Sequence, residues 1–93
     1  MGKYTVVIEP LAQVEIIRHH KSGNKAVIKK LEKILLELTE TPYDGIGNPE
    51  ALKYGLTGLW SRRISQKDRL IYKVEDEIVT VFILSAFGHY SDK

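Results

Sequence analysis

The pattern of apolar side chains divides the first half of the chain into one strand-like and two helix-like segments. Residues 3–8 alternate between two faces, which predicts a strand. Proline suits the first turn of a helix, and the apolar spacing that follows predicts a helix over residues 10–21, ended by residues 22–23. The apolar positions of this helix are Leu11, Val14 and Ile17.

The second helix-like segment carries one continuous apolar stripe and a lysine-rich opposite side. Asn24 suits the N-cap position, because its side chain accepts a hydrogen bond from the first turn. The lysines are expected to form a solvated face, although they could also follow an RNA backbone. The stripe residues are Val27, Ile28, Leu31, Ile34, Leu35 and Leu38, and the lysines are Lys25, Lys29, Lys30 and Lys33.

The second half of the chain changes to short strand-like segments separated by turns. A loop at residues 41–49, with two prolines and two glycines, comes first. Strands are predicted at residues 50–54, 59–65, 69–74 and 78–87. The short links between them indicate an antiparallel meander. The near-continuous apolar run of the last strand predicts burial on both faces and a central position in the sheet.

Together these elements predict an α+β fold in a single domain over residues 1–93. Two N-terminal helices would pack on one face of a small, mostly antiparallel sheet. The other face of the sheet is then free to carry polar side chains.

Composition narrows the chemistry that this fold can carry. The chain has no cysteine, which excludes a disulfide scaffold, a cysteine nucleophile and a thiolate zinc site. Its 43% hydrophobic and 28% charged residues are typical of a folded globular protein. No apolar run reaches the roughly 18 residues of a membrane span, and no signal peptide is visible. We therefore expect a cytoplasmic protein without a membrane partner.

Basic residues gather in the second half, although the formal net charge is only +2. Residues 53–73 contain six lysines and arginines and a single acid, Asp68. This run is either a solvated surface or a nucleic-acid contact. Strand alternation places Arg69 on the open face and allows one of Arg62 and Arg63 to stand beside it. Alternation alone does not decide which.

The histidines and the aromatic residues add further expectations. His19 and His20 are adjacent on the first predicted helix, so their side chains point about 100° apart and cannot chelate one ion. Both are expected at the surface, and no metal site is predicted. Trp60 and Phe87 are expected in the core. Tyr90 lies beyond the last predicted strand, where an exposed ring could stack on a base.

Several segments of the second half recur in the order found in a known family. They are Thr41-Pro42-Tyr43-Asp44-Gly45-Ile46-Gly47, Pro49-Glu50, Leu52-Lys53, Leu56-Thr57-Gly58-Leu59-Trp60-Ser61-Arg62-Arg63-Ile64, Arg69-Leu70-Ile71-Tyr72 and Gly88-His89-Tyr90. In these segments the chain resembles the Txe/YoeB family of bacterial toxins, within the RelE superfamily. The resemblance implies a RelE-like fold similar to that of microbial RNases.

The resemblance also implies an activity and partners. Such toxins are ribosome-dependent mRNA endonucleases, which cut the message in the ribosomal A site and inhibit translation. A cognate YefM-type antitoxin would silence the toxin, and a homodimer is a further expectation. No cofactor is implied.

Residue by residue, the resemblance implies a metal-independent acid–base site. Glu50 would take the proton of a 2′-hydroxyl, Arg69 would stabilise charge on the phosphate, and His89 would protonate the leaving oxygen. The need for a 2′-hydroxyl restricts this chemistry to RNA. The residues implied to bind the substrate are Lys53, Arg63 and Tyr90.

Two other functions stay open from the sequence. A catalytically silent relative would act as a binding module that joins an antitoxin in operon repression. A general RNA-binding domain would bind free RNA with a salt-dependent affinity and would not cleave it.

Overall fold

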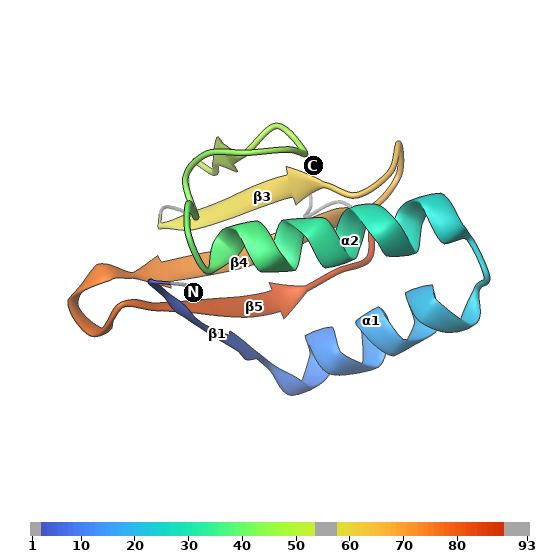
Figure 1. Cartoon of the computed structure of the whole chain (residues 1–93), viewed down its shortest axis with the longest axis horizontal. Helices are drawn as coiled ribbons and strands as arrows, with labels where there is room; N and C mark the ends of the chain where they lie inside the picture. Colours follow the sequence, from blue (N-terminus) through green and yellow to red (C-terminus); the bar gives the residue numbers. More distant parts are fainter. Residues whose placement is uncertain (1–2, 54–57, 89–93) are drawn as a thin grey trace.

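The computed structural model describes residues 3–53 and 58–88. Its strands form one five-stranded sheet, and both helices lie on the same face of that sheet (Figure 1). This arrangement confirms the predicted α+β class. The elements in chain order are β1 (Thr5–Ile8), α1 (Pro10–Lys21), α2 (Lys25–Leu38), β2 (Glu50–Ala51), β3 (Leu59–Arg63), β4 (Arg69–Glu75), the 3-10 turn η2 (Asp76–Ile78) and β5 (Thr80–Ser85).

The sheet is mostly antiparallel, with strand order β1-β5-β4-β3-β2. Among the strands that the structure describes, only β1 and β5 pair in parallel. β5 is internal as predicted, but β4 occupies the middle position. β5 is also shorter than the predicted segment 78–87, because η2 and the left-handed backbone of Val79 (φ 49°) take up its first residues.

The core lies between α2 and the covered face of the sheet. Leu31, Ile34 and Leu38 of α2 are fully buried and pack against β4 and β5. The predicted cap is present, since Asn24 Oδ1 accepts a hydrogen bond from the Val27 N–H at 3.2 Å. The apolar stripe of α2 therefore packs against the sheet, as its spacing predicted.

Helix α1 covers the sheet with a different side from the one its apolar residues suggested. Leu11, Val14 and Ile17 are 58%, 56% and 53% exposed. The residues that α1 buries are Ala12 and His19, which lie two turns apart on one face. The three exposed side chains form an uncovered apolar stripe. Of the helices that the structure describes, none is long and apolar enough to cross a membrane.

Arg62 is fully buried and organises the loop between α2 and β2. It belongs to the basic run that the sequence left open as a solvated surface, and that reading is wrong for this residue. A guanidinium has five N–H donors, and here each of them has an acceptor. The acceptors are Glu37 Oε1 (2.8 Å), the Tyr72 hydroxyl (3.2 Å) and the carbonyls of Thr41 (2.7 Å), Asp44 (2.7 Å) and Ile46 (3.4 Å).

The surroundings of Arg62 are built to keep these hydrogen bonds. Burial raises the pKa of Tyr72 despite the nearby guanidinium, so its hydroxyl keeps the proton that it donates to the Pro42 carbonyl at 2.8 Å. Gly45 adopts φ 135°, and a Cβ there would clash with the Glu37 carboxylate and lie 2.8 Å from Arg62 Nη1. This cluster fixes the loop that leads into β2.

A second polar cluster ties three segments together at the opposite end of β4. The hydroxyls of Tyr43 and Tyr4 donate to the two carboxylate oxygens of Asp76 at 2.6 and 2.7 Å. The hydrogen bonds from Tyr43 and then Tyr4 lower the pKa of Asp76. The same hydrogen bond to Asp76 raises the pKa of Tyr43 to about 12.

Replacing Asp76 with asparagine is expected to reduce the loss of stability in acid. Because the pKa of Asp76 lies below its ordinary value of 3.8 in the folded protein, its ionised form stabilises the fold above that value. This stabilisation is lost as the pH falls through the folded pKa. Urea unfolding of both proteins at neutral pH and at about pH 3 measures the difference. If both proteins lost the same free energy of unfolding between the two pH values, the stabilising role of ionised Asp76 would be contradicted.

Candidate active site

The face of the sheet that the helices leave open carries a group of polar side chains. Side chains of directly paired residues on neighbouring strands point to the same side. Glu50 of β2 pairs with Ser61 of β3, and Arg63 of β3 pairs with Arg69 of β4. Arg62 lies between Ser61 and Arg63 and points toward α2. The four paired side chains therefore share the open face.

Glu50 and Arg69 are the oppositely charged members of this group. Arg69 Nη1 lies 3.6 Å from Glu50 Oε1, and the two side chains are 21% and 59% exposed. This separation is too long for a hydrogen bond, and an exposed ion pair of this kind adds little stability. The strands, rather than the pair itself, therefore bring the two groups together. The carboxylate stays accessible to a third group.

Arg63, and not Arg62, stands beside Arg69. The two arginines face each other across β3 and β4, and like charges in directly opposite positions are destabilising. An anion bound between them would relieve that repulsion. The backbone N–H of Arg63 also donates to the Gly47 carbonyl at 2.6 Å, which ties β3 to the loop before β2.

Lys53 lies outside β2, which is shorter than the strand predicted at residues 50–54. β2 contains only Glu50–Ala51, and Lys53 lies exposed beyond its end. The predicted strand ran to residue 54, which lies outside the described residues. Lys53 is therefore near Glu50 along the chain, without a described contact to it.

His19 is buried, which corrects the expectation that both histidines lie at the surface. It is 4% exposed, and its ring stacks on Phe87 with the centroids 4.1 Å apart. Its Nε2 lies 2.6 Å from the Ala86 carbonyl and must carry the proton, since a carbonyl only accepts. The Glu15 carboxylate accepts a hydrogen bond from the Ala86 N–H at 2.7 Å. Through these two hydrogen bonds, helix α1 holds the carbonyl and the N–H of Ala86, the residue directly after β5.

An irregularity in β5 makes this attachment possible. The pairing with β4 shifts between Ile71 and Tyr72, which leaves Leu84 as an extra residue. The extra residue reverses the alternation of side chains. Ser85 then faces the open side and Ala86, which is fully buried, faces the core.

Gly88 is held next to the start of β4. Its N–H donates to Asp68 Oδ1 at 2.7 Å, and its carbonyl accepts from the Arg69 N–H at 3.1 Å. His89 and Tyr90 follow in the sequence and lie outside the described residues. The described chain therefore ends beside Arg69, one residue before the predicted acid.

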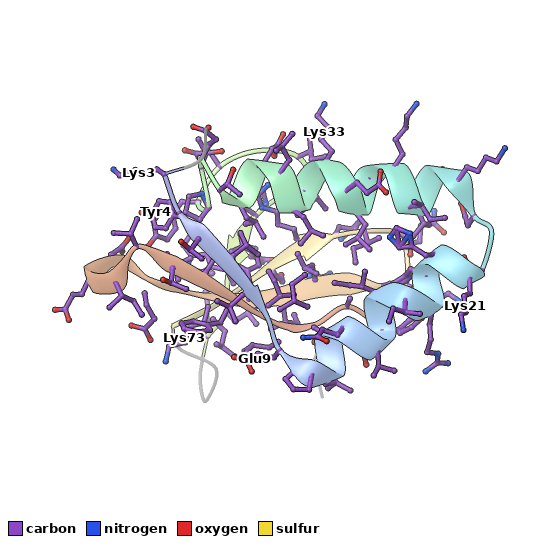
Figure 2. The ribbon with its side chains drawn as sticks, turned by 60° about the horizontal axis from the view of Figure 1, so that its bottom comes forward. Lys3, Tyr4, Glu9, Lys21, Lys33 and Lys73 are labelled. Atoms are coloured by element: carbon purple, nitrogen blue, oxygen red, sulfur yellow. The ribbon has the colours of Figure 1, made fainter. Side chains whose placement is uncertain are left out.

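The lysine face of α2 lies away from this site. Lys25, Lys29 and Lys33 are exposed, and Lys33 points outward from the helix (Figure 2). Because α2 covers the other face of the sheet, these lysines lie on the opposite side of the molecule from Glu50 and Arg69. A contact with RNA there would be separate from the open face.

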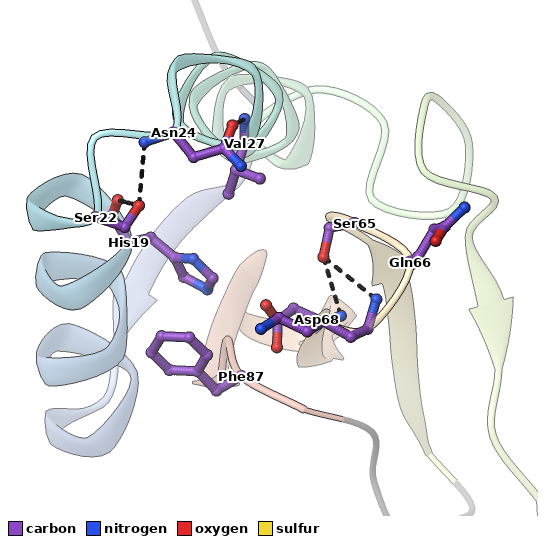
Figure 3. A pocket seen from close by; sticks show the side chains of 9 residues that line it. His19, Ser22, Asn24, Val27, Ser65, Gln66, Asp68 and Phe87 are labelled. Atoms are coloured by element: carbon purple, nitrogen blue, oxygen red, sulfur yellow. Dashed lines mark hydrogen bonds between the residues drawn. The ribbon is translucent and has the colours of Figure 1, made fainter.

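One pocket lies away from the open face. It has a volume of about 580 Å³ and lies between the connection of the two helices and the β3–β4 turn (Figure 3). His19, Phe87 and Asp68 line it, so its wall includes the residues that hold the segment after β5. None of Glu50, Arg63 and Arg69 lines it. Within residues 3–53 and 58–88, no group of three acidic or histidine side chains could hold a metal ion.

Sequence reasoning missed one polar residue of the open face. Ser61 is 1% exposed, and within residues 3–53 and 58–88 its Oγ has no hydrogen-bond partner. The Nε of Arg69 is likewise buried without a partner. Strand alternation puts Ser61 on the same face as Arg63, but no spacing rule distinguishes an unpaired serine from a paired one.

The sequence matches a model for the YoeB-like toxin of bacterial type II toxin-antitoxin systems over residues 12–90. The chain belongs to the YoeB toxin family. The match spans the positions of all six predicted site residues, from Glu50 to Tyr90.

Individual YoeB toxins are similar over most of this chain. Toxin YoeB of Escherichia coli O6:H1 is 40% identical over 67 residues, which cover 72% of this chain and 77% of that protein. Toxin YoeB of Synechocystis is 37% identical over 70 residues, or 75% of this chain and 79% of that protein.

Solved YoeB structures share the fold. The YoeB dimer from Staphylococcus aureus superposes with a TM-score of 0.78 at 32% identity, covering 96% of this chain and 100% of that chain. YoeB in the YoeB-YefM complex from the same organism gives 0.75 at 33% identity, with the same coverage. The arrangement of helices and sheet described above is thus that of the YoeB family.

Proposed function

We propose that this YoeB-family protein is a metal-independent endoribonuclease that cuts mRNA in the ribosomal A site and thereby inhibits translation. The observation that carries the proposal is the open face on which Glu50 lies 3.6 Å from Arg69, with Arg63 paired to Arg69. A carboxylate beside two cations suits a reaction in which a hydroxyl loses a proton while a phosphate gains charge.

The reaction is an attack of the RNA on its own backbone. Glu50 takes the proton of the 2′-hydroxyl, and the 2′-oxygen forms a bond to the adjacent phosphorus. The bond from phosphorus to the 5′-oxygen breaks, and that oxygen receives a proton from the general acid. The products are a 2′,3′-cyclic phosphate and a 5′-hydroxyl. Arg69 stabilises the charge on the phosphate oxygens, where a positioned cation is most effective.

We assign the acid to His89 and a nucleotide contact to Tyr90, in line with the family. This assignment is supported by Gly88, the residue before His89. The Asp68 carboxylate and the Arg69 N–H hold Gly88 beside the start of β4. A histidine suits this role because its ordinary pKa of about 6.5 lets it carry a proton near neutral pH. Lys53 and Arg63 bind phosphates of the message.

A YefM-type antitoxin is the proposed inhibitor in the cell. YoeB of Staphylococcus aureus was solved in a complex with YefM, and also as a dimer. The uncovered apolar stripe of α1, formed by Leu11, Val14 and Ile17, is the kind of surface that a protein partner buries. Light scattering of the protein alone and with a YefM-type partner measures both associations. We place the protein in the cytoplasm, where it meets ribosomes.

The proposal is tested with purified protein, ribosomes and a defined message. We expect cuts in the codon that occupies the A site, and far fewer cuts when the same message is free in solution. Mapping the 3′ ends of the message locates the cuts. An intact message together with intact antitoxin binding would favour the alternative function, a non-catalytic module that acts with its antitoxin in operon repression.

A further inference from the structure

Two buried hydrogen-bond donors of the open face have no partner among the residues that the structure describes. They are Ser61 Oγ and Arg69 Nε. Leaving a buried polar group unpaired costs about 1–3 kcal/mol, and native proteins contain few such groups. Two of them on neighbouring strands, at the proposed active site, therefore call for a functional explanation.

Arg62 shows that this fold supplies hydrogen-bond acceptors to a guanidinium that stabilises the structure. Arg62 is fully buried, and all five of its donors have acceptors within the protein. Arg69 begins the next strand, yet its Nε has none. The carboxylate of Glu50 faces its Nη1 at 3.6 Å, and within the described part of the chain its Nε stays unpaired.

The positions of the two donors put them within reach of one ligand atom. Ser61 pairs with Ile71, and Arg69 lies two residues before Ile71 on the same strand. Such diagonal neighbours have Cα atoms roughly 7–8 Å apart and share one face. The long arginine side chain spans much of that distance. A single small acceptor between the two side chains would satisfy both donors.

The chemistry of the donors defines the ligand. The Nε of arginine donates and never accepts, so its missing partner must be an acceptor. A serine hydroxyl can donate to the same kind of group. Arg63 beside Arg69 adds a second positive charge, which favours an anionic acceptor. A phosphate oxygen meets all three conditions.

We propose that Ser61 is a further catalytic residue, which binds a non-bridging oxygen of the scissile phosphate together with Arg69 Nε. This inference rests on the proposed nuclease function and extends it to a residue without a charge. The phosphate enters when Glu50 and Arg69 separate by side-chain rotation, which their 3.6 Å contact and their partial exposure allow. The hydroxyl and the Nε then form a preorganised site for the charge that develops on that oxygen.

The test replaces Ser61 with alanine and measures cleavage and stability together. Loss of one donor to a developing oxyanion typically lowers kcat about 10²–10³-fold, and we expect a fall of about 10²-fold. We expect kcat and kcat/KM to fall together, because the hydrogen bond strengthens in the transition state. The melting temperature should stay the same or rise, because the change removes an unpaired buried hydroxyl.

Ser85→Ala is the matched control. Ser85 pairs with Ile71 on the far side from Ser61, so it carries the same hydroxyl on the same face one strand further away. We expect its cleavage rate to equal that of the wild type. Ser61→Cys keeps a side chain of similar size but has only a weak donor. Its cleavage rate should lie between those of the wild type and Ser61→Ala.

The outcomes separate this inference from the function on which it rests. If the wild type cuts the message and Ser61→Ala cuts at the same rate, the role of Ser61 is wrong and the nuclease function stands. If Ser61→Ala loses activity and melting temperature together, Ser61 is structural and the inference is overturned. If the wild type does not cut at all, the nuclease function fails and the inference fails with it.

Discussion

Replacing Arg62 with leucine is expected to destabilise the protein by about 3–5 kcal/mol, the range for breaking a buried ion pair by removing one partner. In a protein of 93 residues this corresponds to a fall in Tm of at least about 12 °C. The loss is a large part of a total stability that is typically about 5–15 kcal/mol.

The reason is that every donor of Arg62 holds a different acceptor. Leucine would leave the Glu37 carboxylate without its ion pair and would remove the Arg62 donors from the loop carbonyls of Thr41, Asp44 and Ile46. The first two of these carbonyls keep a hydrogen bond within the loop, from the Asp44 N–H and the Thr41 hydroxyl. These carbonyls belong to the loop that delivers Glu50 to the open face. Even a partly folded variant should therefore have a misplaced Glu50.

Arg63→Leu is the control for this prediction. Arg63 is the next residue, carries the same charge and is exposed, so its free energy of unfolding should change by less than about 0.5 kcal/mol. Urea unfolding of the three proteins gives the comparison. Similar losses for Arg62→Leu and Arg63→Leu would contradict the structural role of Arg62.

Replacing Glu50 with glutamine is expected to lower the rate of message cleavage about 10²–10⁴-fold, the usual cost of removing a general base. Glutamine has nearly the same shape and cannot take the proton of the 2′-hydroxyl. Stability should change little, because the Glu50 side chain is 59% exposed and its contact with Arg69 is long.

The matched control is Glu77→Gln. Glu77 is an exposed carboxylate in η2, at the far end of β4 from Arg69. Cleavage by this variant should match the wild type in single-turnover assays on ribosomes that hold a defined message. A Glu50→Gln protein with a wild-type rate would remove Glu50 from the mechanism.

Patterns of period 3.6 and 2 predicted the elements that carry most of the fold. The stripe of α2 and its Asn24 cap are correct because one helix face packs against the sheet. Strand alternation placed Arg69 on the open face, because the covered face of β4 requires the apolar Leu70 and Tyr72. It could not choose between Arg62 and Arg63, since the choice depends on the ion pair that Arg62 forms with Glu37 of α2.

The errors occurred where a tertiary contact overrides the local pattern. His19 can be buried because the carbonyl of Ala86, 67 residues away in the sequence, accepts a hydrogen bond from its Nε2–H. The apolar residues of α1 indicated the wrong covered face. The small side chain of Ala12 lies against the sheet, and the larger side chain of Leu11 stays exposed. No periodicity predicts the extra residue in β5 that turns Ala86 toward the core.

The central claim is that the open face promotes attack by a 2′-hydroxyl of the message, and one substrate tests it most directly. Two messages are compared on ribosomes, one all-ribose and one with a single 2′-deoxynucleotide at the mapped cut. We predict that the ribose message is cut to a 2′,3′-cyclic phosphate and a 5′-hydroxyl, and that the deoxy message stays intact. Cleavage of the deoxy message, or products with a 3′-hydroxyl and a 5′-phosphate, would contradict the account.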